Sequence, residues 1–230
     1  MPVLTDIRIE FDAEEIILSL QKGRKPSQTL LSETKKSILE AKNLLRPAIV
    51  YDWFKILRIV ENQVILSAEN PDQEIKLNIG QHIDLIKKAE LAMISVVTIG
   101  SNLDERVRAL NRSGENLSGY LLDSIGVVAL SKIREIVTKM VQREAYKQSW
   151  GIGPILGPGS LAGWPLSGQA DLCALLPIEQ IGVYLNETSV LVPLKSASAI
   201  KCIGPEYGPM DIVSVCQLCT HKDTCWRRHD

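Results

Sequence analysis

An excess of charge of either sign is the first thing that this sequence lacks. Its 26 Lys and Arg residues nearly balance its 27 Asp and Glu residues, and the formal net charge is -1. The two signs are interspersed, so no basic face is expected, whereas a protein that binds duplex nucleic acid normally carries one. A nucleic-acid partner is therefore not expected.

Long apolar runs are also missing. The longest, from Leu91 to Ile99, is interrupted by Ser95 and Thr98 and is shorter than the roughly 20 residues that a membrane-spanning helix requires. No membrane partner is expected. The run is instead typical of a buried strand at the centre of a sheet.

A secretory signal is not evident at the start of the chain, because Met1 to Phe11 mixes charged with apolar residues. The five cysteines are an odd number and three crowd together near the C-terminus, unlike the disulfide framework of a secreted protein. Reduced thiols and a cytoplasmic location are therefore expected. The isolated Cys173 and Cys202 are expected to be buried packing residues.

Several familiar motifs are absent from the sequence: a Gly-x-Gly-x-x-Gly after a strand, a P-loop and a Gly-x-Ser-x-Gly nucleophile elbow. What the sequence does contain is an irregular succession of helices and strands, so an α+β fold is expected, with an antiparallel or mixed central sheet and helices packed around it. The chain length favours one main domain, residues 1–213, in which residues 1–47 form a helical N-terminal region. A cysteine-rich tail, residues 214–230, follows this domain.

Apolar periodicity and β-propensity place the elements. The predicted helices are Asp12 to Leu20, Ser27 or Thr29 to Arg46, Gln81 to Ala89, one through Leu103 to Leu110, Glu115 to Ala145 and Ser167 to Leu176. The predicted strands are Ala48 to Leu57, Gln63 to Ser67, Glu74 to Leu77, Leu91 to Ile99, Ile181 to Leu185, Val190 to Val192 and Ser196 to Ile203.

An uncharged segment rich in glycine and proline runs from Gly151 to Gly168, with Trp150 and Trp164 near its ends. This composition predicts an ordered loop that lies over a core or lines a pocket, with the two tryptophans as packing anchors.

A tight turn follows the predicted central strand at Gly100 to Asn102. Ser101 and Asp104 have the spacing of a helix-capping pair. The alternative is that the backbone amides of this turn approach a ligand.

The cysteine tail is the clearest chemical motif. Cys216, Cys219 and Cys225 provide three soft ligands within ten positions, which suit zinc or an iron–sulfur cluster. The nearby histidines favour zinc, with His221 as the predicted fourth ligand. Other candidates for that position are His229, Cys202 or an exogenous group. The alternative is a reduced, metal-free tail or an adventitious disulfide.

Taken together, the segments resemble the activation domain of vitamin B12-dependent methionine synthase, and more specifically its stand-alone relatives. The resemblance rests on the following segments: Leu44 to Pro47, Val97 to Asp104, Gly119 to Gly126, Trp164 to Gln169 after Pro158-Gly159, Ile181 to Ser189, Pro193 to Ser198, and Cys216-x2-Cys219-x5-Cys225-x2-Arg228.

The resemblance implies a helmet-shaped α+β fold that binds S-adenosylmethionine and docks on a corrinoid-binding protein or on the methionine synthase core. There it would methylate a corrinoid cofactor (cobalamin) while flavodoxin or ferredoxin supplies an electron, which rescues inactive cob(II)alamin. Such chemistry depends on positioning and requires few acid–base groups.

The resemblance also implies site residues. In the family, an Arg-x-x-Pro-Gly-Tyr motif contacts S-adenosylmethionine, but here Ile155 stands in place of the Arg and Ser160 in place of the Tyr. An isoleucine cannot pair with a ligand carboxylate as an arginine does. The backbone amides of the loop are expected to bind the ligand instead. The predicted ligand-binding residues are Gly157, Pro158, Gly159, Ser160, Asp104, Glu187, Ser189, Ser196 and Ser198.

Four of these residues, Glu187, Ser189, Ser196 and Ser198, have plain structural alternatives. Residues 187–189 fit a hairpin turn, and Ser196 and Ser198 fit the exposed face of a strand. At the level of function, the sequence leaves open a non-catalytic module that docks on a corrinoid protein and uses the cysteine-bound metal for assembly or electron transfer. A third hypothesis is a metal-tailed structural protein with no corrinoid partner.

Overall fold

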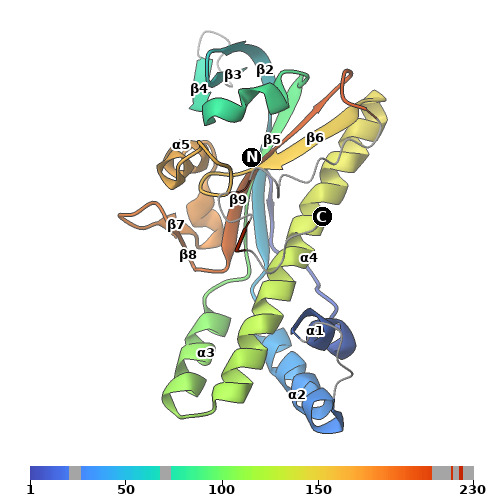
Figure 1. Cartoon of the computed structure of the whole chain (residues 1–230), viewed down its shortest axis with the longest axis vertical. Helices are drawn as coiled ribbons and strands as arrows, with labels where there is room; N and C mark the ends of the chain where they lie inside the picture. The colour runs from blue at the N-terminus through green and yellow to red at the C-terminus, as the bar shows by residue number, and fades with distance from the viewer. Residues whose placement is uncertain (21–26, 68–73, 209–218, 220–222, 225–230) are drawn as a thin grey trace.

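The computed structural model describes residues 1–20, 27–67, 74–208, 219 and 223–224, and it shows helices packed around a central sheet (Figure 1). The α-helices are α1 (Ala13–Leu20), α2 (Gln28–Leu44), α3 (Asn102–Arg112), α4 (Asn116–Gln148) and α5 (Gln169–Cys173). The 3-10 helices are η1 (Gly80–Ile86), η2 (Leu166–Gly168) and η3 (Ile178–Ile181).

The strands of the main sheet follow the order β4-β3-β2-β5-β9-β6, with β1 beside β2, and a separate small sheet pairs β7 with β8. The strands are β1 (Val3–Leu4), β2 (Ala48–Val60), β3 (Gln63–Ser67), β4 (Glu74–Asn78), β5 (Leu91–Thr98), β6 (Gly151–Leu156), β7 (Tyr184–Leu185), β8 (Leu191–Val192) and β9 (Ser196–Gly204). All of these pairings are antiparallel. The predicted α+β class is confirmed.

Strand β5 occupies the middle of the sheet, between β2 and β9. Its Ser95 lies opposite Tyr51 of β2 and Ala199 of β9. All of its residues after Leu91 are buried, which confirms the prediction of a central buried strand. Because successive side chains of a strand point to opposite faces, β5 and β9 each supply two hydrophobic cores.

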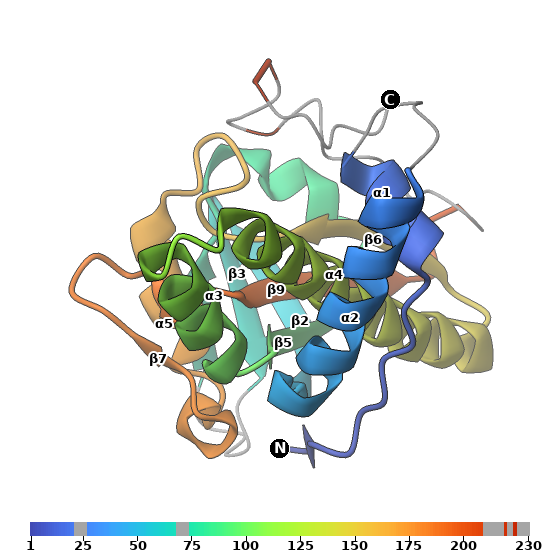
Figure 2. The same ribbon diagram turned by 90° about the horizontal axis from the view of Figure 1, so that it is seen from below.

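The two cores lie on opposite faces of the sheet. On one face, Met93 and Val97 of β5 pack against the layer formed by α1 to α4. On the other face, Ile94 and Val96 pack against η1, α5, η3 and the loops around them. Figure 2 shows α5 and β7 to the left of the sheet strands and α2 to their right. Any site on β9 therefore opens toward one of two different environments.

Helix boundaries follow local chemistry. The hydroxyl of Ser27 accepts a hydrogen bond from the backbone N–H of Leu30 at 3.2 Å and caps the start of α2. That helix ends at Leu44, shortly before Pro47, which cannot continue a helix. The long helix α4 ends where Ser149 adopts the left-handed conformation with φ 56°.

The prediction of a continuous loop from Gly151 to Gly168 is wrong at its start, because residues 151–156 form strand β6. Pro154 is tolerated because β6 lies at the edge of the sheet and its pairing with β9 is irregular between Ile152 and Ile155. At Gly151, a Cβ would lie 2.2 Å from the carbonyl oxygen of Tyr207, so close packing requires the glycine.

The elements between Ser167 and Val192 are shorter than predicted. Ile181 belongs to η3, and only Tyr184–Leu185 of the predicted strand pairs, as β7. Gly182 separates the two with a φ of 67°, a left-handed conformation that ends the 3-10 helix. The predicted helix from Ser167 is divided between η2 and α5.

Among the described residues, no helix is both long and apolar enough to cross a membrane. The division into residues 1–213 and 214–230 stays a prediction.

The end of β9 allows a direct stability test. A Cβ at Gly204 would lie 2.1 Å from the backbone carbonyl oxygen of Lys88, which cannot move aside as a flexible side chain would. Gly204→Ala is expected to lower the free energy of unfolding by about 1–3 kcal/mol or more through overpacking. Urea denaturation measures this change.

Gly114→Ala is the matched control. Gly114 has a φ of 85° and no other atom would lie within 4 Å of its Cβ, so only backbone strain of about 1–2 kcal/mol is added. A loss at Gly204 no larger than the loss at Gly114 would contradict the close approach of β9 to Lys88.

Candidate functional site

The loop predicted to bind the ligand, Gly157 to Ser160, connects β6 to the buried Trp164. Within it, Gly159 donates its N–H to the carbonyl of Trp164 at 2.9 Å, and Ser160 donates to the carbonyl of Gly157 at 3.3 Å. Gly159 has a φ of 76°, which favours glycine. Two amides that the sequence assigns to a ligand are thus used inside the turn, so a ligand here must be held by other groups.

A chain of hydrogen bonds joins three segments that were predicted to contribute to the site. Ser198 of β9 donates to Oε1 of Gln169 at 2.8 Å, and Gln169 donates from Nε2 to the carbonyl of Ser189 at 2.7 Å. Gln169 is only 6% exposed. A Cβ at Gly157 would lie 3.2 Å from the carbonyl of Ser198. The fold therefore brings Gly157, Ser189 and Ser198 together on the α5 side of the sheet.

Ser196 and Glu187 lie apart from that group. Ser196 donates to the hydroxyl of Thr98 at 2.9 Å, and both Ser196 and Ser198 are partly buried rather than on an exposed strand face. Glu187 is exposed in the turn between β7 and β8, where Asn186 accepts the N–H of Val190 at 2.8 Å. The hairpin-turn interpretation of residues 187–189 is confirmed.

Asp104 belongs to a third cluster, on the helical side of the sheet. Its Oδ1 accepts from Nζ of Lys195, which also donates to Asp123 at 2.7 Å. Ser101 makes no side-chain capping bond, so the predicted capping pair is wrong. Asp104 instead accepts a hydrogen bond from Lys195, which is 91 positions away in sequence and which the fold places beside it.

The charges of Lys195, Asp104 and Asp123 in this cluster interact strongly. Burial opposes the charge on Lys195 more than any other single cause, but the hydrogen bonds and charges of Asp104 and Asp123 together raise its pKa. The second carboxylate oxygen of Asp104 is buried and has no hydrogen-bond partner among the described residues. Gly126 makes room for the lysine, since a Cβ there would lie 2.7 Å from the Lys195 Cδ.

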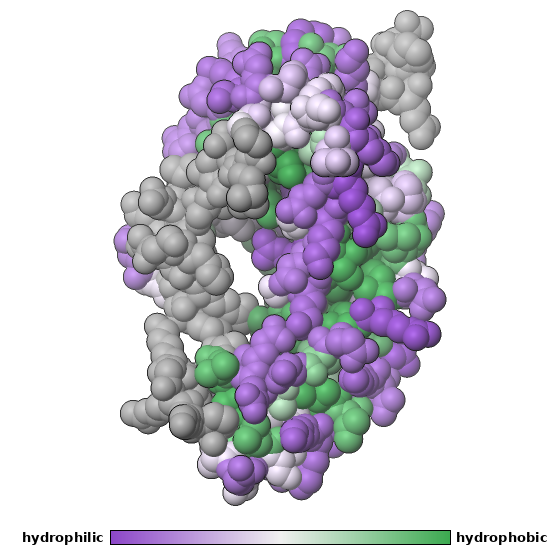
Figure 3. Space-filling view, turned by 90° about the vertical axis from the view of Figure 1, so that its right-hand side faces the viewer, coloured by the Kyte–Doolittle hydropathy of each residue, from purple (hydrophilic) through white to green (hydrophobic). Residues whose placement is uncertain are grey.

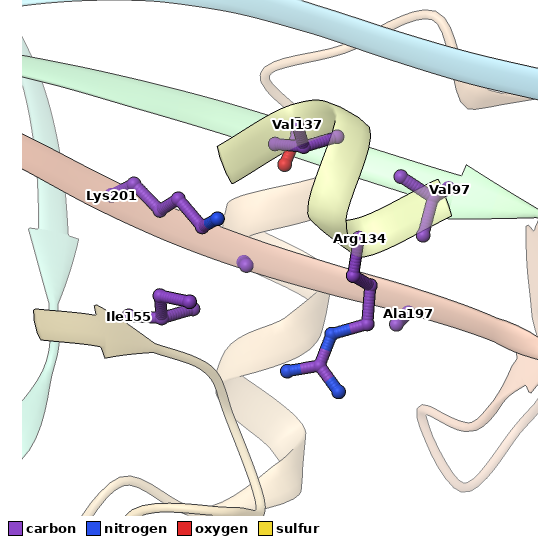
Figure 4. Close-up of a pocket in the computed structure, with 8 residues that line it drawn as sticks. Val97, Arg134, Val137, Ile155, Ala197 and Lys201 are labelled. Carbon is purple, nitrogen blue, oxygen red and sulfur yellow. The ribbon is translucent and has the colours of Figure 1, made fainter. Parts of the chain in front are cut away.

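A pocket with two cationic groups lies between α4 and the strands β5, β9 and β6 (Figure 4). The pocket is shallow and partly open to solvent. The lining residues are Ser95, Val97, Arg134, Val137, Ile155, Ala197, Ala199 and Lys201. Ile155, which stands in place of the family arginine, therefore faces this pocket.

Lys201 is the unusual member of this pocket, because it is a lysine in the middle of an apolar strand and is only 3% exposed. Its ammonium donates to the hydroxyl of Thr138 on α4. Burial, and then repulsion from Arg134, lower its pKa from 10.5 to about 8. Desolvation also lowers the pKa of Arg134, although that residue is exposed on α4 and only part of it adjoins the pocket. Sequence reasoning missed both residues; the available signal was Lys201 interrupting the apolar run Ile200 to Ile203.

The outer surface of α4 is polar. Figure 3 faces the side of the molecule on which this helix lies and shows a band of hydrophilic side chains with hydrophobic ones beside it. Exposed residues such as Lys139 and Arg143 belong to this helix. The pocket therefore lies under a helix that is solvated on its other face.

The predicted metal ligands Cys216, His221 and Cys225 lie outside the described residues. Cys219 is described, and its backbone forms an isolated antiparallel bridge with Leu161 beside the glycine-rich loop. No cluster of potential metal ligands occurs among the described residues, so the zinc or iron–sulfur site stays a prediction.

The two isolated cysteines are packing residues, as predicted. Cys173 and Cys202 are buried in the core on the α5 side. Burial raises the pKa of each thiol to about 12. Neither is therefore a reactive thiolate near neutral pH.

These features define an α+β domain with a central antiparallel sheet, a helical layer on one face, and candidate polar sites on both faces of β9. No protein-family model and no curated protein matches the sequence. Among solved structures, the chain resembles a crystal structure of the MetH reactivation domain bound to AdoHcy, with a TM-score of 0.53. The match covers 90% of this chain and 80% of that one at 14% identity. It shows the likeness of fold that the sequence segments predicted.

Removing the ammonium group of Lys195 is expected to destabilise the protein. Lys195→Met leaves Asp104, whose side chain is only 12% exposed, without its partner, and such a change typically destabilises a protein by about 3–5 kcal/mol. Asp123→Asn is the control, because Asp123 has a side chain that is 49% exposed and its loss should cost no more than about 1 kcal/mol. Equal losses by urea denaturation would contradict the structural role of Lys195.

Lys201 is expected to make stability depend on pH. The folded protein releases the proton near pH 8 and the unfolded chain near 10.5, so between these values the unfolded state binds more protons. The free energy of unfolding therefore rises with pH in this window, by up to about 1.4 kcal/mol per pH unit. Below pH 8 both states are protonated and this contribution is constant.

Comparison with Lys201→Met isolates this effect from the other titrating groups. The variant removes an unpaired buried charge, so it is expected to be more stable than the wild type by about 1–3 kcal/mol near pH 7, with the difference shrinking as the pH rises. Urea titrations at several pH values measure it. A difference that does not change with pH would show that Lys201 titrates normally.

Proposed function

We propose that this protein binds S-adenosylmethionine and serves the reactivation of a corrinoid cofactor held by a partner protein. The observation that carries the proposal is the likeness, over 90% of the chain, to a reactivation domain bound to AdoHcy. AdoHcy is what remains of S-adenosylmethionine after its methyl group has been transferred. The segments of the sequence that resemble the activation-domain family support the same function.

The reaction transfers a methyl group from the sulfonium to reduced cobalt, so the S–CH3 bond breaks, a Co–C bond forms and AdoHcy leaves. The electron that reduces the cobalt comes from a flavodoxin or ferredoxin. The task of this chain is to bind and orient the methyl donor, and positioning of this kind can supply much of a rate enhancement. Two regions of β6 and β9 are available for that task. One is the polar group formed by Gly157, Ser189 and Ser198 on the α5 side, and the other is the pocket beside Ile155 on the α4 side.

The second candidate function is a docking module that binds a corrinoid protein without the methyl donor. The observation that favours it is the occupied turn: the amides of Gly159 and Ser160 donate within the loop, and Ile155 and Ser160 replace the charged and aromatic residues of the family motif. In this case the cysteine tail would hold a metal for assembly or electron transfer.

Calorimetric titration with S-adenosylmethionine and AdoHcy separates the two functions. The reactivation function predicts binding in the micromolar range. Ser198→Ala removes a hydroxyl from the hydrogen-bonded group and should weaken binding about two- to tenfold, the value of one hydrogen bond. Ser131→Ala, at an exposed position on α4, is the control and should have no effect.

Absence of binding to the folded protein, alone and with a corrinoid protein present, would contradict the proposal. If that protein nevertheless formed a complex with the corrinoid protein in analytical ultracentrifugation, the docking module would be the correct function.

A further inference from the structure

The pocket beneath α4 contains positive charge that the protein itself does not balance. Lys201 and Arg134 both line it, and their charges are close enough for Arg134 to lower the pKa of Lys201. No acidic side chain among the described residues forms an ion pair with either one. Lys195, by contrast, forms ion pairs with two aspartates.

A buried lysine without an ion-pair partner destabilises the folded state. A lysine that is almost fully buried is rare unless it is paired, and bringing its charge out of water costs free energy. Placing a guanidinium beside it adds repulsion. Met93 and Ile155 are the register partners of Lys201 on the neighbouring strands, and Arg134 is the one charged group that faces it from α4 among the described residues. Folding alone gives no reason to put a cation at this position.

An anion in the pocket would remove this conflict. Figure 4 shows the Lys201 ammonium and the Arg134 guanidinium directed into the space between α4, β9 and β6. A guanidinium offers a planar pair of donors that matches an oxyanion, and an ammonium adds a compact point charge. The walls of Val97, Val137 and Ala197 are apolar, so the attraction is stronger than it would be between fully solvated groups.

We propose that Arg134 and Lys201 form a binding subsite for the terminal oxyanion, a carboxylate or a phosphate, of a small molecule. The ligand enters between α4 and the strands β6 and β9 and inserts only its charged end. Ile155 borders this subsite on β6, the edge strand of the sheet. A ligand that lies along the Gly157 loop on the α5 side reaches the subsite by passing around this edge. The carboxylate of S-adenosylmethionine is the oxyanion that the proposed function supplies, and that one assignment rests on the proposed function.

The test uses the full-length protein labelled with ¹³C-lysine, inorganic phosphate and acetate as probes, and NMR as the readout. Both anions are expected to bind and to raise the pKa of Lys201, because an anion stabilises the protonated form. Affinity for acetate, which stays singly charged, should fall as the pH rises above 8, where Lys201 loses its proton.

Two variants and two matched controls make the test specific. Arg134→Gln and Lys201→Met should each weaken phosphate binding at least about tenfold, the effect of losing a charged hydrogen-bond partner. Arg143→Gln and Lys139→Met, at exposed positions on the same helix, should leave it unchanged. Lys201→Met is expected to fold and to be more stable, so its loss of binding cannot be attributed to unfolding. Anion binding that survives both pocket variants, or falls equally in the controls, would overturn the proposal.

The source of the oxyanion is determined separately, by comparing S-adenosylmethionine with 5′-methylthioadenosine, which lacks the carboxylate. If only the former displaces phosphate and raises the Lys201 pKa, the carboxylate of the methyl donor occupies the subsite. If S-adenosylmethionine does not bind while phosphate still depends on Arg134 and Lys201, the subsite stands and the proposed function fails. If neither phosphate nor acetate binds, the subsite is wrong, whether or not S-adenosylmethionine binds elsewhere.

Discussion

The antiparallel pairing of β5 with β9 is the constraint on which the rest of the structure depends. It fixes the register from Leu91 opposite Ile203 to Thr98 opposite Ser196. In a pleated strand this register also decides which face each side chain reaches. Ser198 is thereby directed to the α5 side, and Lys201 to the side of α4. A shift of one residue would exchange the two faces, and both polar sites would be lost together.

Local patterns were sufficient to predict much of this fold. The apolar run of β5, the periodicity of α4 and the burial of Cys173 each depend on near neighbours in sequence, and each is confirmed. Strand β6 was not predicted, because its glycines and proline are unfavourable in a strand unless it lies at an edge. The edge position is a property of the whole sheet and cannot be read from the segment itself.

The candidate site was harder to predict for the same reason. Gly157, Ser189 and Ser198 were named from segments that resemble a family, and the fold does bring them together. Asp104 was assigned to the same site, but its partner Lys195 holds it in a different cluster. The proximity of Lys201 to Arg134 depends on where α4 crosses the sheet, which no local pattern encodes.

Lys201 and Arg134 lower the stability of the fold, because an unpaired lysine lies on the helical face of the sheet beside an arginine, where an apolar residue would fit. We infer that the methyl donor lies across the edge strand β6, from the Gly157 loop on the α5 side to the pocket beside Arg134 and Lys201 on the α4 side. A crystal structure of the protein with AdoHcy tests it most directly. We expect the ligand beside Ile155, with its carboxylate bonded to Arg134 and Lys201. AdoHcy bound elsewhere on the protein, or absent from crystals grown at saturating concentration, would contradict this claim.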